Sequence, residues 1–279
     1  MADERGVNPE PTPTPSPGDK GGRTESVLLS VRHLTKTYGA VRAVDDVSLD
    51  VVDNEVLGIV GDNGAGKSTF ISLLIGAEPM TTGETYFRGR RVHVSSPAVS
   101  RRELDIEVIF QDLAMAPDLT VWENLYLGQE LHRHRILLDR KTMRLRSDAV
   151  LQSLDTKIHA TDLVSSLSGG ERQLTAVARA LLFDRSILFM DEPTAAVSAA
   201  KADDVLRLIE DLRRRGKTIL LISHRLEDVL RVCDRVAIFV NGRLPYVKRA
   251  ADLDVAGLAH LMFSSAPRLS PANGDISVE

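Results

Sequence analysis

An eight-residue glycine-rich segment constrains this chain more than any other feature. Residues 61–68 read Gly-Asp-Asn-Gly-Ala-Gly-Lys-Ser and fit the spacing G-x-x-x-x-G-K-[S/T], between an apolar run and a helical pattern. Glycines let backbone N–H groups approach a triphosphate closely, and the start of a helix presents further unpaired N–H groups to the anion. We therefore expect Lys67 to reach the β- and γ-phosphates and Ser68 to ligate Mg²⁺. A turn without a ligand would not need Lys and Ser at these positions.

A second, acidic motif completes this expected site. Residues 187–190 form a short apolar run that ends in Asp191 and Glu192, at the edge where parallel α/β sheets bind ligands. We expect Asp191 to complete the magnesium site, and Glu192 to accept a proton from the attacking water or to orient it. An acidic helix cap is the alternative explanation, and the upstream phosphate cradle makes it the weaker one.

The order of apolar runs predicts an α/β fold. Residues 27–52 alternate in short apolar runs, which predicts an N-terminal antiparallel β subdomain. Residues 96–165 are mostly helical in pattern, so we expect an inserted α-helical subdomain at about 96–180. Asn241-Gly242 predicts a closing hairpin. Helices and strands of a parallel sheet are expected to alternate at 171–183, 186–190, 201–215, 218–222, 226–232 and 235–240.

Both ends of the chain lack the composition of a folded core. Residues 1–26 are rich in Pro, Gly, Thr and charge and predict a disordered Pro-rich tail, and residues 264–279 predict a flexible C-terminal tail. The folded region is therefore expected at 27–263. A single cysteine, Cys233, excludes an intramolecular disulfide and is expected to be a core residue.

Charge and hydropathy argue against several functions. The 35 basic and 39 acidic side chains give a net charge of −4, which provides no general attraction to nucleic acid. No run approaches the roughly 20 apolar residues that span a bilayer, and the N-terminus does not resemble a signal peptide. We expect a cytoplasmic chain that only a partner holds at a membrane. His132 and His134 could suggest a metal site, but no third ligand clusters nearby, which favours a solvated charged face.

A third motif stands at the start of a predicted helix, where residues 167–173 read LSGGERQ. Ser168 and Glu171 fit an S-x-x-E capping box, which would satisfy free N–H groups whatever the function. A capping box does not require the adjacent Gly169 and Gly170, whereas close approach to a phosphate does. LSGGERQ, after GDNGAGKST and before ILFMDEP, closely resembles the signature of ATP-binding-cassette (ABC) ATPases. The resemblance covers nearly all of residues 27–263.

The resemblance implies a P-loop NTPase core with bound ATP and Mg²⁺, and ATP hydrolysis coupled to transport. Members of this family dimerise head to tail, so the signature of one subunit would contact the γ-phosphate held by the other. Three further residues match the family one by one. Tyr38 resembles the aromatic that stacks on adenine, Gln111 the glutamine that joins the magnesium site to the transmembrane partner, and His224 the switch histidine that supports Glu192. Without the family they would be read as a core tyrosine, a solvated glutamine and a structural histidine.

The expected site residues fall into four groups. The catalytic group is Glu192, His224 and Lys67, and the metal group is Ser68, Gln111 and Asp191. The residues expected to bind ATP within one chain are Tyr38, Gly61, Asp62, Asn63, Gly64, Ala65, Gly66, Lys67, Ser68 and Thr69. Those expected to bind ATP of the second subunit are Ser168, Gly169 and Gly170. One departure is Ser198, where many family members carry Asp, which puts the strength of that contact across the dimer in doubt.

The residues of these motifs resemble those of the carbohydrate-importer group for fructose, ribose and xylose, in its single-cassette form. This similarity implies a monosaccharide cargo, transmembrane permease subunits and an extracytoplasmic solute-binding protein as an indirect partner. It also implies a second ATPase subunit, in a homodimer or a heterodimer of separate chains with the homodimer favoured, and a peripheral place at the cytoplasmic face of the inner membrane. The motor of another ABC transporter shares every catalytic residue and stays an alternative. A DNA-repair or translation ATPase is less favoured, because a long coiled-coil insertion or a second cassette is missing. Glu192 argues against a nucleotide sensor without turnover.

We expect the permease to dock on a hydrophobic surface at residues 111–127. Trp122 and Tyr126 lie within this segment, and exposed aromatic side chains are typical of interfaces, whereas a buried Trp122 is the alternative.

Overall fold

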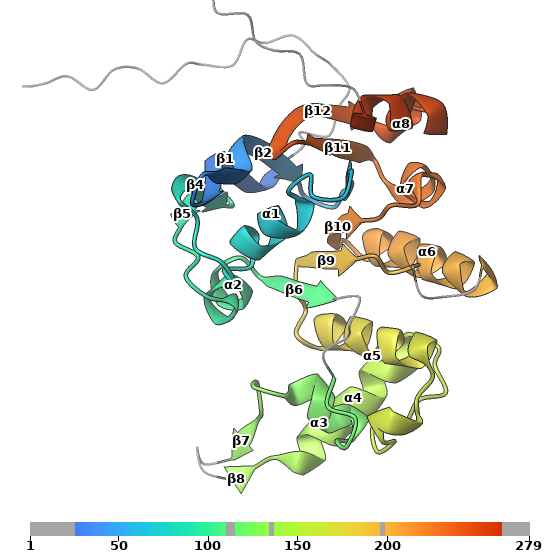
Figure 1. Cartoon of the computed structure of the whole chain (residues 1–279). Helices are drawn as coiled ribbons and strands as arrows, with labels where there is room; N and C mark the ends of the chain where they lie inside the picture. The colour runs from blue at the N-terminus through green and yellow to red at the C-terminus, as the bar shows by residue number, and fades with distance from the viewer. Residues whose placement is uncertain (1–25, 110–114, 134–136, 196–198, 264–279) are drawn as a thin grey trace, which may run out of the picture.

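The computed structural model describes residues 26–109, 115–133, 137–195 and 199–263. Both expected tails, Gln111, His134 and Ser198 lie outside these residues. The described chain has two parts (Figure 1): one part holds two β-sheets with helices around them, and the other is mainly helical. No helix among the described residues is long and apolar enough to cross a bilayer.

A six-stranded sheet forms the centre of the larger part. Five neighbouring strands run parallel and the edge strand β12 is antiparallel to β11. Every residue of β3 and β10 is buried, which explains why their sequences are continuous apolar runs rather than alternating ones. The strand order is β12 (Arg243–Arg249), β11 (Arg235–Val240), β3 (Val56–Gly61), β10 (Thr218–Ile222), β9 (Ile187–Asp191) and β6 (Ile106–Ile109).

Helices and a second sheet cover the two faces of this central sheet. On one face a core cluster joins α1 (Lys67–Leu74) to the antiparallel strands, and on the other face a second cluster joins helices to the opposite side of the same strands. The helices of the second face are α5 (Gly169–Leu182), α6 (Ala199–Arg214), α7 (Leu226–Val232) and α8 (Val255–Phe263), which follows the short η2 (Ala250–Asp252). The predicted α/β architecture is therefore confirmed.

The N-terminal antiparallel sheet forms as predicted and is larger than predicted. Strands β1 (Val27–Tyr38) and β2 (Val41–Val52) pair directly, and β4 (Thr82–Phe87) and β5 (Arg90–Val92) extend the sheet in the order β2-β1-β4-β5. The hairpin predicted at Asn241-Gly242 also forms, since both residues have positive φ and connect β11 to β12.

The helical part contains α3, α4 and α5 packed around a separate core cluster. Its elements are α3 (Val121–Tyr126), the small hairpin β7 (His132–Arg133) and β8 (Leu137–Leu138), α4 (Arg140–Ser153), η1 (Val164–Ser166) and α5 (Gly169–Leu182). Within the range 96–165 that was expected to be mostly helical, α2 (Pro97–Glu103) is followed by strand β6 of the central sheet. The helical prediction was wrong for β6, because four residues with the charged Glu107 among them are too few to display a strand period.

The prediction that Trp122 and Tyr126 are exposed was wrong. Trp122 is 9% exposed and Tyr126 is 2% exposed, and both belong to the core cluster of the helical part. The Tyr126 ring packs edge-on against Phe183 at the end of α5, with 5.6 Å between ring centroids. These aromatic side chains hold α3 on its neighbours and leave no aromatic surface for a partner.

Candidate functional site

The glycine-rich loop leads from the end of β3 into α1. Gly66 is the N-cap residue of α1, and its φ of 102° is unfavourable for any residue with a side chain. A Cβ added there would lie 2.4 Å from the carbonyl oxygen of Ala43, so the start of strand β2 leaves no room for one. The first turn of α1 contains no acidic residue and begins with Lys67, Ser68 and Thr69. Its free N–H groups are thus available to an anion.

Lys67 lies across the loop that precedes it. Its ammonium group donates hydrogen bonds to the carbonyl oxygens of Gly61, at 2.8 Å, and Asp62, at 3.0 Å. Partial burial lowers the pKa of Lys67, although the nearby carboxylates of Glu192, Asp62 and Asp191 act in the opposite direction. A partly desolvated cation beside the first turn of α1, whose N–H groups are free, provides a strong field for a phosphate chain.

The two acids that were predicted to act at this site end strand β9 beside the loop. Burial, and next the neighbouring Glu192, raise the pKa of Asp191, whereas Lys67 lowers it. Glu192 has a φ of 50°, which a residue with a side chain rarely adopts, and its backbone N–H donates to the carbonyl oxygen of Ile222 at the end of β10. Strained backbone of this kind is common where a side chain must be aimed at a reacting group.

His224 lies next to Glu192, as the sequence led us to expect. Nδ1 of His224 is 2.7 Å from a carboxylate oxygen of Glu192, and the backbone N–H of His224 donates to the same oxygen at 3.4 Å. The two residues follow neighbouring parallel strands, whose carboxyl ends meet at one edge of the sheet. The His224 side chain is 66% exposed and the Glu192 side chain 18% exposed, so the histidine also faces outward toward a ligand.

The donor set fits a magnesium triphosphate. Ser68 is exposed at the start of α1 and offers a hydroxyl oxygen, and Asp191 offers a carboxylate that accepts no hydrogen bond from the described residues. Oxygen ligands of this kind suit a hard cation such as Mg²⁺. A half-buried carboxyl that is disfavoured as an anion gains most from a cation bound beside it. The described part of the chain contains no cluster of three or more His, Cys, Asp or Glu side chains that could hold a metal ion.

Tyr38 stands at the end of β1 and is 47% exposed, which excludes the alternative of a core tyrosine. The ammonium group of Lys36 lies 4.8 Å from the centre of its ring. The ring thus has an accessible surface on which a flat base can stack. Gln111, the third expected metal residue, lies outside the described residues, and its role stays a prediction.

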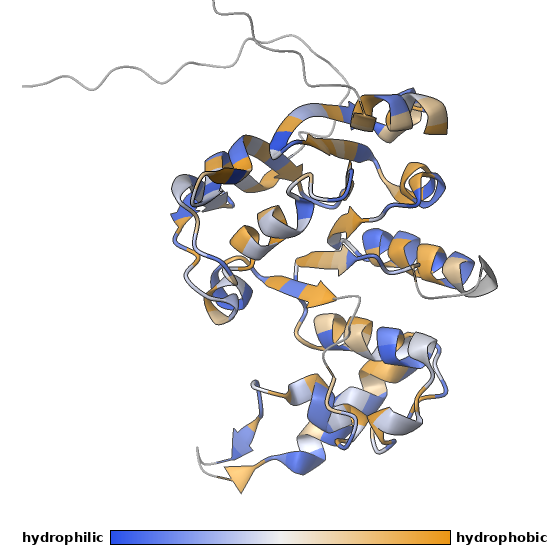
Figure 2. Cartoon of the chain, viewed as in Figure 1, coloured by the Kyte–Doolittle hydropathy of each residue, from blue (hydrophilic) through white to orange (hydrophobic). Residues whose placement is uncertain are grey.

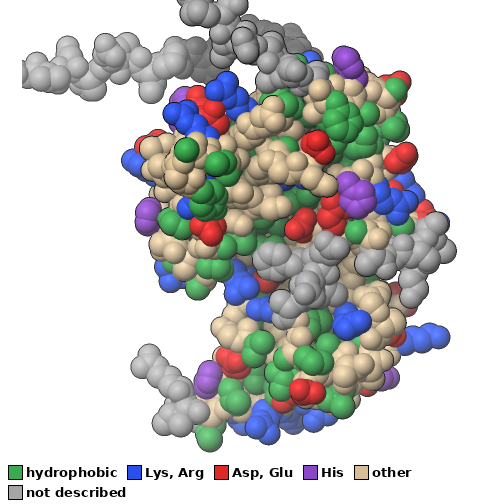
Figure 3. Space-filling model, viewed as in Figure 1, with side chains coloured by type: hydrophobic (Ala, Val, Ile, Leu, Met, Phe, Trp, Pro, Cys, Tyr) green, Lys and Arg blue, Asp and Glu red, His purple; other side chains and the backbone are tan. Residues whose placement is uncertain are grey.

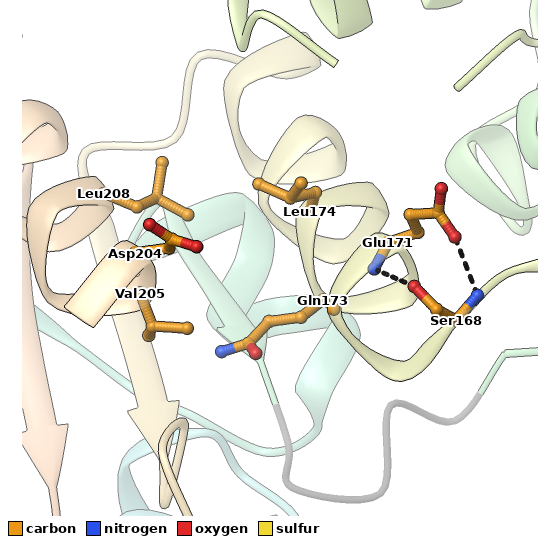
Figure 4. Close-up of a pocket in the computed structure, with 8 residues that line it drawn as sticks. Ser168, Glu171, Gln173, Leu174, Asp204, Val205 and Leu208 are labelled. Atoms are coloured by element: carbon orange, nitrogen blue, oxygen red, sulfur yellow. Dashed lines mark hydrogen bonds between the residues drawn. The ribbon is translucent and has the colours of Figure 1, made fainter. Parts of the chain in front are cut away.

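The signature segment forms the N-terminus of α5 (Figure 4). Ser168 is the N-cap residue, its hydroxyl accepts the N–H of Glu171 at 3.4 Å, and the Glu171 carboxylate accepts the N–H of Ser168 at 2.8 Å. The predicted capping box is therefore present. It does not account for Gly169 and Gly170, because neither has a positive φ and a Cβ on either would meet nothing within 4 Å. The fold of one chain thus places no demand for glycine at these positions.

Ser168 and Gly170 do not face the phosphate loop of their own chain. Figure 4 shows the first turns of α5 beside α6, where Leu174 and Gln173 point toward Val205 and Leu208 across a pocket of about 250 Å³. In Figure 1, α1 packs against the central sheet whereas α5 belongs to the helical part. The site that the sequence predicts is therefore divided between two separate surfaces of the chain.

Two supporting contacts were not predicted from the sequence. The amide of Gln173 in α5 donates to the carbonyl oxygen of Pro193, which follows Glu192 directly, at 3.0 Å. The hydroxyl of Thr194 donates to the buried carboxylate of Asp228 in α7 at 2.7 Å. Both contacts fix the segment after Glu192, yet they join residues 20 and 34 positions apart along the chain. Only the motif Glu-Pro-Thr itself could have indicated that this segment needs support.

Comparison with known proteins identifies the family. The family model described as ABC transporter matches residues 44–195. A xylose/arabinose import ATP-binding protein of Sulfolobus acidocaldarius is 39% identical over 242 residues, which cover 86% of this chain and 96% of that protein. A fructose import ATP-binding protein of Rhizobium meliloti is 40% identical over 224 residues, which cover 77% of this chain and 86% of that protein.

Other comparisons agree with these relatives. A ribose import ATP-binding protein of Rubrobacter xylanophilus is 37% identical over 84% of the chain, which spans only 47% of that longer protein. The crystal structure of a nucleotide-free ATP-binding cassette from an ABC transporter superimposes with a TM-score of 0.74 and 26% identity, covering 86% of this chain and all of the other. The phosphate loop, the acidic strand end and the signature helix are thus those of a cassette, and the chain belongs to the ABC transporter family.

Proposed function

We propose that this chain is the ATP-hydrolysing subunit of an importer and that its cargo is a monosaccharide. Two copies of the chain would bind two molecules of ATP between them, each held by the loop of one copy and the α5 tip of the other. Binding would close the pair and hydrolysis would release it, and a permease would convert this cycle into transport.

The residues at the loop support direct roles in hydrolysis. Lys67 and the N–H groups of α1 would hold the β- and γ-phosphates, and Ser68 with Asp191 would hold Mg²⁺, which neutralises phosphate charge when bound. Glu192 would accept the proton of the water that attacks the γ-phosphate, so that ADP and phosphate leave. His224, 2.7 Å from Glu192, would keep that carboxylate aimed at the water. Tyr38 would stack on the adenine.

One observation carries the proposal of a shared site. Gly169 and Gly170 leave open space at a helix tip where their own chain needs none, and this tip does not face its own phosphate loop. A helix tip without side chains is suited to a phosphate that arrives from outside the chain. A second copy with the same loop supplies such a phosphate in a two-fold arrangement, in which each copy completes the site of the other.

Mixing two inactive variants tests the shared site. Lys67→Ala removes the loop contact and Ser168→Arg blocks the helix tip, so each protein alone should lose ATP hydrolysis. In an equal mixture, pairs of unlike copies have one intact site, so about a quarter of all sites regain activity. Phosphate release from the mixture should therefore rise well above that of either variant. A mixture as inactive as its components would contradict the shared site.

A second variant tests turnover. Glu192→Gln removes the proton acceptor and keeps the size of the side chain, so we expect ATP to bind and to hold the pair closed while hydrolysis falls by about 100-fold or more. Size-exclusion chromatography with ATP and Mg²⁺ should then show a dimer, which the parent forms only transiently. Unchanged turnover in Glu192→Gln would remove Glu192 from its proposed role.

The relatives support the cargo and the partners. Several are named as import proteins for xylose and arabinose, fructose or ribose, all of them monosaccharides. We propose that this chain binds permease subunits of the same kind, which would hold it at the cytoplasmic face of the membrane, and that a solute-binding protein delivers the sugar. Deletion of the gene should abolish uptake of one labelled monosaccharide, and the parent sequence but not Lys67→Ala should restore it.

Because Trp122 and Tyr126 are buried, we propose that the permease binds instead at a neighbouring cavity. A cavity of about 280 Å³ lies where β6, α3 and α5 meet, and its lining includes Arg101, Glu107, Leu127 and Arg179. Glu107 is almost fully buried, and the guanidinium groups of Arg101 and Arg179 both lie 3.6 Å from it. The excess of positive charge favours a permease segment that carries a carboxylate.

Leu127 allows a test of this contact without disturbing the core. Its side chain is 44% exposed at the cavity, so Leu127→Glu should fold normally, reduce sugar uptake strongly and leave basal ATP hydrolysis unchanged. Leu163→Glu is a matched control, because Leu163 is 48% exposed and does not line the cavity. Equal uptake in the two variants would argue against this cavity as the docking site.

A further inference from the structure

The hairpin β7–β8 and the start of α4 form a tip of the helical part that is both apolar and cationic. We call this the tip surface and define it by Leu137, Leu138 and Leu145 with Arg133, Arg140, Lys141 and Arg144. From this tip surface we infer that the chain contacts an anionic phospholipid surface directly, in addition to any contact through a permease. The inference goes beyond the proposed function, since it needs neither ATP nor a permease.

The apolar half of the tip surface is unusually exposed. Leu137 is 67% exposed, Leu138 is 44% exposed and Leu145 is 61% exposed. Figure 2 shows β8 as an apolar strand beside a hydrophilic β7 at the end of the molecule farthest from the central sheet. Three exposed leucines on adjoining elements gain nothing from the fold of the described chain, whereas they would gain from hydrocarbon below a layer of headgroups.

The cationic half of the tip surface lies on β7 and on α4, the elements next to or shared with these leucines. Arg140 and Arg144 are one turn apart on α4, Lys141 and Leu145 form the neighbouring row, and all four are exposed. Arg133 extends the charge onto the hairpin with a side chain that is 73% exposed. In Figure 3, Lys and Arg side chains gather along this end of the helical part. Long cationic side chains next to apolar ones can reach lipid phosphates while their stems rest on acyl chains.

The sign of this charge is not explained by the stability of the helix. Arg140 and Lys141 occupy the first turn of α4, which has no acidic residue, although the positive end of the helix dipole disfavours cations there. Arg140 and Arg144 also repel each other. The whole chain has a net charge of −4, so a local concentration of positive charge is not a consequence of its overall composition. Positions that break a local stability rule in this way are expected where function requires them.

Nearby carboxylates do not neutralise the tip surface. Glu130 accepts the backbone N–H of Gly128 at 3.0 Å. Asp139 accepts the N–H of Thr142 at 3.2 Å and lies 3.9 Å from the guanidinium of Arg133. Hydrogen bonds from Thr120, and to a smaller extent the charge of Arg140, lower the pKa of Glu123, but Arg140, Lys141 and Arg144 form no ion pair at 4.0 Å or less with another described residue. An acidic bilayer supplies both the negative charge and the apolar layer that this surface lacks, whereas an acidic peptide supplies only the charge.

Sedimentation with lipid vesicles tests the inference. The purified full-length chain should sediment with vesicles that contain phosphatidylglycerol and much less with vesicles of phosphatidylcholine alone, and binding should weaken as salt rises. Each cation near an anionic surface contributes about a fivefold gain in affinity. The triple variant Leu137→Ser, Arg140→Glu, Arg144→Glu should therefore bind at least about 25-fold more weakly.

Two further variants keep the result clear. The control is a triple variant that makes the same kinds of change at exposed positions of β12: Val247→Ser, Lys248→Glu, Arg249→Glu. It should leave vesicle binding unchanged. Arg140→Lys with Arg144→Lys keeps the charge and should retain it. If the parent chain does not sediment with acidic vesicles, or if the β12 variant loses binding equally, the inference is overturned. ATP hydrolysis in the same preparations reports on the proposed function separately.

Discussion

Replacing Gly170 by Ala should affect the stability of the fold and the activity of the shared site in opposite directions. Gly170 is in the first turn of α5 with ordinary helical backbone, and an added Cβ meets nothing within 4 Å. Alanine should therefore stabilise the chain by about 0.5–1 kcal/mol, because it restricts the unfolded chain and favours helix. For a folded region of this size, such a gain corresponds to a rise of about 1–4 °C in melting temperature.

The same methyl group should remove activity. In the proposed dimer the N–H groups of the α5 tip approach the γ-phosphate of the second copy, and the Cβ would occupy that space. Loss of one such charge-stabilising contact lowers the turnover of an enzyme by about 100-fold. Phosphate release at saturating ATP measures the activity, and a thermal melt without nucleotide measures the stability.

Gly66→Ala is the control with the opposite structural environment. Its Cβ would lie 2.4 Å from a backbone oxygen at a φ of 102°, so this variant should lose both stability and activity. If Gly170→Ala hydrolysed ATP at the parent rate, or lost activity only together with stability, the reasoning about open space at the α5 tip would be refuted.

Three more predictions follow from burial and charge. Trp122→Ala should lower the free energy of unfolding in urea by about 3–5 kcal/mol, because it empties a core position; a fall below 1 kcal/mol would show a surface residue. Burial raises the pKa of Asp191, so ionisation of this carboxyl lowers the stability of the fold as the pH rises. Asp191→Asn should therefore have a higher melting temperature than the parent at neutral pH, and this difference in melting temperature should shrink toward about pH 4. A difference that stays the same across this pH range would contradict the pKa shift. Burial also raises the pKa of the Cys233 thiol, so a disulfide reagent should label it only in denaturant, and rapid labelling of the native protein would exclude its core position.

The chemistry of the site could be predicted from the sequence because its motifs are local. The phosphate loop, Asp191 and Glu192 each follow an apolar strand, and parallel strands bring their ends together at one edge of the sheet. The boundaries of β10, α7 and β11 agree with the predicted ranges, since buried strands and an amphipathic helix have clear patterns.

Predictions failed where tertiary packing decides. Trp122 and Tyr126 occur in a short segment with polar neighbours, and only the assembled helices α4 and α5 show that both side chains are enclosed. Strand β6 is recognised as a strand only by its pairing with β9. The contact between Gln173 and Pro193 joins two motifs that no local pattern connects. Long-range contacts of this kind depend on the complete fold.

The hydrogen bond from Gln173 to Pro193 has a consequence for the timing of the proposed pair. In the proposed dimer, Gln173 would follow the helix tip that contacts one nucleotide, whereas Pro193 would adjoin the acid that acts at the other. A displacement of the α5 tip would therefore also move the segment after Glu192 in the same subunit, through this 3.0 Å hydrogen bond. In the proposed dimer, the two nucleotide sites would then not act independently, because a change at one nucleotide would alter the position of the groups at the other.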